Sequence, residues 1–288
     1  MSAVYDAPRA CMDQPLVDAN REGWLHSGFH TAVNLFFPPS SQDTGRLITL
    51  LAPGRALVPD SLLLSEEAFA AVQRLPLDSR VHKQGTLLIW KNPPLCLSFG
   101  HTRTDNPQIP ACRAENILCA VAQIQTNTHK PHGLKQLYGS DCANRIQGLY
   151  RLAECLKRGQ TMQALHRIVE SVGAGPGLTP SSDDMMVGIL TALRSLGCRA
   201  PFPDAAAAYA ALEGRTTDVG RQYICRALEG SISETMRDAL TGNASAWNQL
   251  AETGATSGID TLTGLEIGCR VWTKPTTGED YETLTRDP

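Results

Sequence analysis

The sequence predicts an α+β protein, with a small N-terminal β-barrel or sandwich-like domain followed by a mainly α-helical C-terminal domain. The chain has 288 residues, of which 42% are hydrophobic and 19% charged, as in globular proteins with one large or two modest cores. Short β-type runs between Pro, Gly and Asp turns fill the chain up to about residue 100. Beyond residue 110 the hydrophobic pattern has a helical period.

We expect the β-rich domain to span residues 21–108, after a loosely held N-terminus at 1–20. Its predicted strands lie at 31–37, 46–51, 61–64, 85–90 and 95–99. One helix interrupts them at 65–75. Ser65 is a suitable N-cap for this helix, Glu66 and Glu67 suit its first turn, and Phe69 and Val72 face the same way.

The helical domain is expected at 109–273, with a polar tail at 274–288. Its predicted helices lie at 113–124, 141–158, 161–172, 182–196, 204–212, 217–228, 233–240, 244–252 and 259–272. A polar linker at 126–135 carries His129 and His132. These two imidazoles could hold a metal ion, although no third ligand lies nearby in the sequence.

The stretch 173–188 combines a glycine-rich loop, a helix start and two acidic residues. Alternating glycines allow positive φ and a close approach to a ligand, and a helix N-terminus attracts anions. Capping alone could explain the serine and the aspartates, since Ser181 and Asp184 have the spacing of a capping box, but it leaves the glycines unexplained. The residues concerned are Gly173, Gly175, Gly177, Pro180, Ser181, Asp183 and Asp184.

A second stretch, 254–264, repeats this pattern with a one-residue gap. In both stretches an Asp is followed four residues later by a Gly, so the two share one helix face and the glycine allows a close approach by another helix. We expect the two helix starts to converge on one ligand; the alternative is a chance similarity between two helix caps. The second motif contains Gly254, Thr256, Ser257, Gly258, Asp260, Leu262 and Gly264.

Together the two motifs resemble those of the bacterial oxamate carbamoyltransferase subunit family (AllH-like). The first family motif is matched by residues 175–184 except at Ser182, and the second by residues 254–264 except at Ala255, where the family often has His. Thr216 and Thr217 resemble a shared Thr-Thr helix segment. A weaker likeness covers 24–64.

This resemblance implies carbamoyl transfer between oxalurate and phosphate, giving oxamate and carbamoyl phosphate, in allantoin (purine) catabolism. It also implies a hetero-oligomer with two other, unrelated subunits, so the chain alone would be inactive. The substrate would be small and anionic, resembling phosphate, a carbamoyl compound or oxamate.

Such a reaction needs N–H and O–H donors for oxygen atoms that carry negative charge. We therefore expect substrate to be bound by the amides of the loop glycines, by hydroxyl groups and by an arginine. The catalytic candidates are three aspartates, which would orient donors, bind a cation such as Mg²⁺ or accept a proton. The binding candidates are Gly175, Gly177, Thr179, Ser181, Thr256, Ser257, Gly258 and Arg215, with Arg221 as a second counter-charge; the catalytic candidates are Asp183, Asp184 and Asp260.

Two alternatives remain open. The Ala255 substitution favours a non-catalytic anion-binding or scaffold subunit, whose partners carry the catalytic groups. A stand-alone hydrolase or kinase-like enzyme is disfavoured, because the glycine loop lacks the Gly-Lys-Ser/Thr ending of a nucleotide-binding loop.

Net charge, apolar runs and cysteine content limit the partners and the compartment that we expect for this chain. The formal charge of −3 gives no reason to expect nucleic acid or an acidic membrane as a partner, and no apolar run approaches the length of a membrane span. The nine cysteines are odd in number and include no Cys-x-x-Cys pair. We therefore expect the cysteines to behave as small buried hydrophobic residues of a protein in a reducing cytoplasm, and not to form a disulfide framework or a zinc ribbon.

Overall fold

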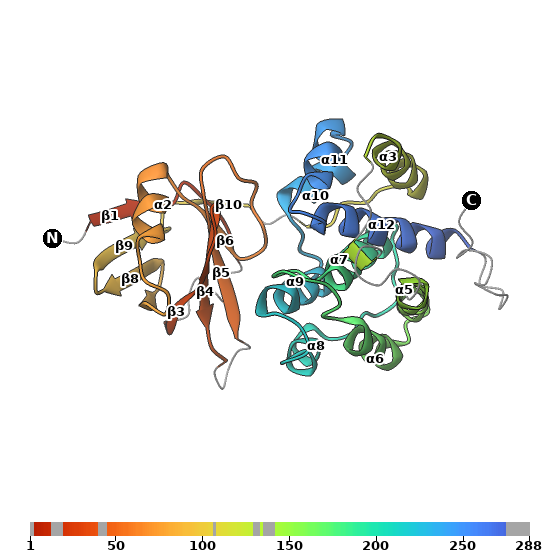
Figure 1. Cartoon of the computed structure of the whole chain (residues 1–288), viewed down its shortest axis with the longest axis horizontal. Coiled ribbons are helices and arrows are strands. Elements are labelled where there is room, and N and C mark those ends of the chain that lie inside the picture. Colours follow the sequence, from red (N-terminus) through yellow and green to blue (C-terminus); the bar gives the residue numbers. More distant parts are fainter. Residues whose placement is uncertain are drawn as a thin grey trace. The chain divides into compact units, whose positions relative to one another are not determined.

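The computed structural model describes residues 3–12, 20–39, 45–105, 108–128, 133–134 and 142–274. The chain divides into two compact units, Met1–Pro107 and Gln108–Pro288. The first is built on a β-sheet and the second on helices (Figure 1). The predicted α+β class, with the β-rich part first, is confirmed.

The described strands of the first unit form one mixed sheet in the order β1-β9-β8-β7-β3-β4-β5-β6-β2-β10. Most neighbours are antiparallel, but β1 is parallel to β9, β5 to β6 and β2 to β10. The strands are β1 (Ala3–Asp6), β2 (Arg9–Cys11), β3 (Arg21–Gly28), β4 (Ala32–Phe37), β5 (Arg46–Leu51), β6 (Ser61–Leu63), β7 (Arg80–Gln84), β8 (Leu87–Lys91), β9 (Pro94–Ser98) and β10 (Arg103–Thr104).

The chain connection between β1 and β2 shows that this sheet is curled. Only Ala7 and Pro8 separate the two strands, yet they are first and ninth in the sheet order. Eight strand spacings of a flat sheet would measure about 38 Å, whereas this short connection reaches only about 11 Å. The sheet must therefore bend round until its two ends come close, as in a partly closed barrel.

The prediction of a loosely held N-terminus is wrong for the described residues before Met12. Ala3 is paired with Leu95 and Arg9 with Leu63, so this segment is ordered by partners far along the chain. A local sequence pattern carries no signal of such distant pairing. Residues 13–19 lie outside the described part of the chain.

The curled sheet packs its inner side chains around helix α2 (Glu66–Gln73). Ala68, Phe69 and Val72 of this helix share one core with buried side chains of the sheet, among them Trp90 and Leu97. The predicted cap is confirmed, since Ser65 Oγ accepts a hydrogen bond from the Ala68 amide at 3.2 Å.

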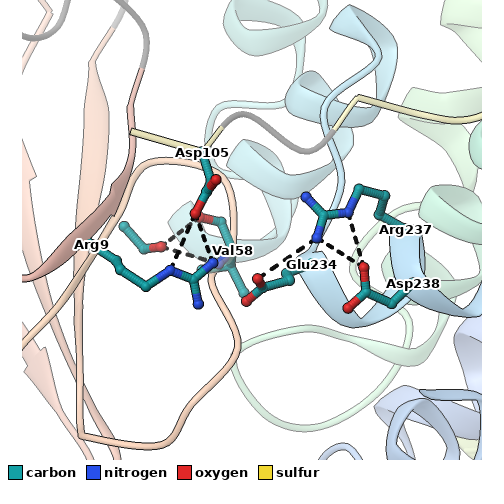
Figure 2. A network of polar contacts seen from close by, with 7 residues as sticks. Arg9, Val58, Asp105, Glu234, Arg237 and Asp238 are labelled. Atoms are coloured by element: carbon teal, nitrogen blue, oxygen red, sulfur yellow. Dashed lines mark hydrogen bonds and ion pairs between the residues drawn. The ribbon is translucent and has the colours of Figure 1, made fainter. Parts of the chain in front are cut away.

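An ion pair links β2 to the segment that follows β10. The Arg9 guanidinium donates to Asp105 Oδ2 from Nη2 at 2.7 Å and from Nε at 3.2 Å (Figure 2). The Asp105 amide also donates to the Ala10 carbonyl at 2.8 Å. The last strand of the sheet is therefore held by side-chain as well as backbone contacts.

The helices of the second unit agree with the predicted ranges to within a few residues. On one of them, α10, Arg237 pairs with Asp238 at 2.8 Å and with Glu234 at 3.7 Å (Figure 2). The helices are α3 (Ala114–Asn127), α5 (Cys142–Lys157), α6 (Thr161–Ser171), α7 (Ser181–Ser195), α8 (Ala205–Ala211), α9 (Asp218–Glu229), α10 (Glu234–Leu240), α11 (Ala244–Ala251) and α12 (Ser257–Thr273).

Helices α7 and α12 pack against each other with their backbones in contact (Figure 1). A Cβ atom added to Gly264 would lie 2.0 Å from the Met185 carbonyl oxygen, and one added to Gly188 would lie 2.2 Å from the Thr261 carbonyl oxygen. The predicted close approach at the two Asp-x-x-x-Gly faces is thus confirmed. Each glycine lies one turn beyond its aspartate, so this contact brings Asp184 and Asp260 towards each other.

Candidate functional site

The glycine loop before α7 folds back onto the first turn of that helix. The Ser182 amide donates to the Ala174 carbonyl at 3.0 Å, and the Ala174 amide donates to Ser182 Oγ at 2.9 Å. Gly175 within this closed loop has φ +135°, and a Cβ atom there would lie 2.4 Å from the Ser181 amide nitrogen. Only glycine fits this position.

Ser181 is the first residue of α7, and its hydroxyl does not cap the helix. The N-cap position is taken by Pro180, which has no side-chain acceptor. The capping-box interpretation of Ser181 and Asp184 is therefore wrong. Ser181 is 1% exposed, and no described group forms a hydrogen bond with its Oγ atom. A buried hydroxyl without a partner is unusual and needs an explanation.

Asp183 is held in place by three donors. Its Oδ1 atom accepts from the Gly173 amide at 2.8 Å and from Ser182 Oγ at 3.2 Å, and its Oδ2 atom accepts from the Thr216 hydroxyl. The next residue, Thr217, caps α9 by accepting from the Gly220 amide at 2.9 Å. Asp183 thus ties the glycine loop to the start of α9.

The two sequence motifs meet at Asp184. The Thr179 and Ser257 hydroxyls form a hydrogen bond of 3.0 Å with each other, and both favour the ionised form of the Asp184 side chain. Thr179 belongs to the loop before α7 and Ser257 is the first residue of α12. The structure therefore brings the two helix starts together, as predicted; that they bind one ligand stays a prediction.

Gly133 completes this junction and was not singled out from the sequence. Its amide donates to Asp260 Oδ1 at 2.8 Å. A Cβ atom on Gly133 would lie 2.0 Å from Ser181 Oγ and 3.1 Å from Thr256 Oγ1, so these two hydroxyls point at the same spot. An isolated glycine in a polar linker gives no periodic signal. The neighbouring His129 and His132 lie outside the described residues.

Burial dominates the electrostatics of the aspartates. Desolvation raises the pKa of Asp184 well above its usual range; the nearby carboxylates of Asp260 and Asp183 raise it further, while the Ser257 and Thr179 hydroxyls oppose the shift. Desolvation also raises the pKa of Asp183, against its three hydrogen bonds. Both side chains therefore retain a proton to higher pH than a free aspartate does.

Two of the predicted binding residues make contacts within the fold. The Gly258 amide donates to the Thr253 carbonyl at 2.9 Å, and its Cα packs against the backbone of Leu250 in α11. Arg215 is exposed, and its carbonyl oxygen lies against Gly173. The Gly258 amide and the Arg215 carbonyl are therefore used within the fold; that either residue binds substrate stays a prediction.

The second predicted counter-charge, Arg221, is engaged elsewhere. Its Nη2 atom lies 2.6 Å from Asp218 Oδ1, and its guanidinium stacks 4.0 Å from the centre of the Tyr209 ring. Among the groups that shift the pKa values of Asp183 and Asp184 there is no Arg or Lys. The carboxylates are stabilised by hydroxyls and amides rather than by these arginines.

Nowhere in the described residues do three or more His, Cys, Asp or Glu side chains form a group that could hold a metal ion. A Mg²⁺ ion needs only one or two protein carboxylates when substrate oxygens complete its coordination, so the suggested ion stays a prediction. Ala255 is exposed. No described helix combines the length and apolar character needed to cross a membrane.

Comparison with known families matches both units. The model described as the AllH family N-terminal domain matches residues 4–104, and the model described as oxamate carbamoyltransferase subunit AllH matches residues 171–269. The latter range includes both helix starts of the site. Searches of curated proteins and of solved structures gave no match. Since the two matched ranges cover most of the chain, the protein belongs to the AllH family of oxamate carbamoyltransferase subunits.

Proposed function

We propose that this chain binds the reacting carbamoyl group in an oxamate carbamoyltransferase, at the junction of α7 and α12. The reaction is carbamoyl transfer between oxalurate and phosphate in allantoin (purine) catabolism. It takes place in a cytoplasmic assembly with two other, unrelated subunits. One observation carries the proposal: Asp184 joins the two motifs beside a buried Ser181 hydroxyl that has no partner among the described residues.

The chemistry defines what the site must supply. A phosphate oxygen bonds to the carbamoyl carbon of oxalurate, the bond from that carbon to the oxamate nitrogen breaks, and the nitrogen takes up a proton. Oxamate and carbamoyl phosphate result. Negative charge builds on the carbamoyl oxygen in the tetrahedral adduct, so preorganised donors at that oxygen lower the barrier.

The start of α7 offers such donors. No described group accepts a hydrogen bond from the amides of Gly175 and Gly177. The Ser181 hydroxyl lies at the same helix end, where the α7 dipole favours negative charge. Amides, hydroxyl and dipole together suit an oxyanion.

A matched pair of variants tests the proposal, because α7 contains two buried hydroxyls without a described partner. Ser181→Ala removes the one at the junction, and Thr191→Val removes the one on the third turn of the helix. Neither breaks a described hydrogen bond, so both proteins should unfold at nearly the wild-type temperature. We expect Ser181→Ala to lose about 10- to 100-fold in kcat, the value of a hydrogen bond to a charged group.

The assay uses the full chain assembled with the proteins that co-purify with it, and measures phosphate released from carbamoyl phosphate in the presence of oxamate. Thr191→Val should keep wild-type activity. Equal activity of Ser181→Ala and wild type would contradict a role for this hydroxyl in the reaction.

The second candidate is a non-catalytic scaffold subunit. It is favoured by Asp183, Gly188 and Gly264, whose contacts are all internal and are explained by folding alone. In this case the assembly would need the chain for its integrity, and Ser181→Ala would leave catalysis unchanged. The same pair of variants therefore decides between the two candidates.

A further inference from the structure

We propose that Asp184 works as a neutral carboxylic acid that donates a hydrogen bond from Oδ2 to an oxygen atom of the bound substrate. The inference rests on the proposed function and adds the protonation state and the role of one residue. It reverses the usual expectation that an aspartate at such a site accepts a proton.

The two carboxylate oxygens of Asp184 have unlike surroundings. The Thr179 and Ser257 hydroxyls act on the side chain and lower its pKa, whereas Oδ2 is buried and has no hydrogen-bond partner among the described residues. Asp184 as a whole is 7% exposed. An ionised oxygen that is buried without a donor is costly, because neither water nor protein compensates its charge. A proton on Oδ2 removes that cost.

The neighbouring charges favour the same state. In the described part of the chain, the titratable groups that act on Asp184 are Asp260 of α12 and Asp183 of α7, both carboxylates. Two or three carboxylates cannot all ionise in one buried place without strong repulsion. Protonation of one of them relieves that repulsion.

The hydrogen-bond pattern identifies Asp184 as the residue that keeps the proton. Both oxygens of Asp183 accept from described donors, and a backbone amide, that of Gly133, donates to Asp260 Oδ1, whereas no described backbone amide donates to the Asp184 side chain. The pKa of Asp184 is raised well above the usual range, with burial as the main cause. A proton on Oδ2 has no described acceptor within the protein, so it is available to a ligand.

A second unpartnered group points to the same junction. Ser181 Oγ faces Gly133, whose amide is bonded to Asp260. A hydroxyl donor and a carboxylic acid donor beside a helix N-terminus form a site for an oxygen atom with negative charge. The carbamoyl oxygen of the tetrahedral adduct is such an atom, and a phosphate oxygen has the same requirement. This assignment also reduces the number of negative carboxylates beside a bound anion from three to two.

The test compares two substitutions in the assembled enzyme. Asp184→Asn keeps the shape, places an N–H donor at Oδ2 and leaves an oxygen for the Thr179 and Ser257 hydroxyls. We expect it to keep kcat within about 10-fold of wild type, and Asp184→Ala to lose about 100-fold or more. In wild type, kcat should fall as the pH rises and Asp184 ionises; in Asp184→Asn this fall should be absent. Equal losses in both variants, or an unchanged alkaline fall in Asp184→Asn, would overturn the proposal.

A measurement without substrate separates this inference from the proposed function. Infrared difference spectra of the full chain at neutral pH should show the C=O stretch of a protonated carboxylic acid. Asp184→Asn should remove this band and Asp183→Asn should retain it. No such band in wild type, or its loss in Asp183→Asn alone, would refute the assignment. A wild-type assembly with the band but without carbamoyl transfer would refute only the proposed function.

Discussion

The contact between α7 and α12 makes Gly264 one of the most tightly packed glycines of the helical unit. In Gly264→Ala the new Cβ atom would lie 2.0 Å from the Met185 carbonyl oxygen and 2.9 Å from the Met185 Cα. Ordinary contact begins near 3.4 Å, so the helices must separate by about 1.4 Å. The obstacle is backbone, which no rotamer change can move.

The expected cost follows from these distances. Overpacking of a core costs about 1–3 kcal/mol, and a clash with backbone belongs at the upper end. Alanine regains up to about 1 kcal/mol through its helix propensity. We therefore expect a net destabilisation of about 2 kcal/mol. The catalytic assembly should lose activity too, because the same shift separates Asp260 from Asp184.

Gly148→Ala in α5 is the matched control, since its Cβ atom would make an ordinary 3.7 Å contact with Ser171 Oγ. This variant should be more stable than wild type by about 0.5–1 kcal/mol. Urea unfolding followed by far-UV circular dichroism measures the stability of both variants, because nearly all of the described helix lies in the second unit. If Gly264→Ala unfolded at the same urea concentration as Gly148→Ala, the close packing of these helices would be refuted.

Three further outcomes follow from the buried polar groups. The pKa of Asp184 is raised in the folded state, so its contribution to stability is complete below the usual aspartate pKa and is lost as the pH rises through the raised value. Asp184→Asn should therefore gain stability relative to wild type with increasing pH. A difference in urea midpoints that does not change with pH would contradict this. Thr216→Val removes one donor to Asp183 and should destabilise the chain by about 1–3 kcal/mol in the same unfolding assay, whereas Thr216→Ser should restore stability. Burial raises the pKa of Cys269 to about 12, so iodoacetamide should spare this thiol in the native chain and label exposed Cys119, as peptide mass spectrometry would show.

The sequence predicted the helical unit well, because its signals are local. Each helix carries its own periodicity and often its own cap, as Asp204 and Thr217 show by accepting bonds from the first turns of α8 and α9. The strands β1 and β2 were missed for the opposite reason. Their order depends on partners such as Leu95 and Leu63, which no short window of sequence contains.

The sequence predicted many residues of the candidate site, but it did not predict all of the contacts that they make. The repeated Asp-x-x-x-Gly spacing correctly indicated that Asp184 and Asp260 lie on facing helices. The sequence could not show that Gly133 enters the junction or that the Gly258 amide is used internally. Those facts depend on where loops fold back, which side-chain types alone do not determine.

The short connection between β1 and β2 has a consequence for the order in which the first unit forms during synthesis. The earliest residues of the chain contribute to both ends of the sheet, yet β9 and β10, which they must meet, are made about ninety residues later. Until then the nascent chain has two open strand edges. Premature pairing of these edges with other chains is therefore a hazard to its biogenesis until β10, which ends at Thr104, has been synthesised.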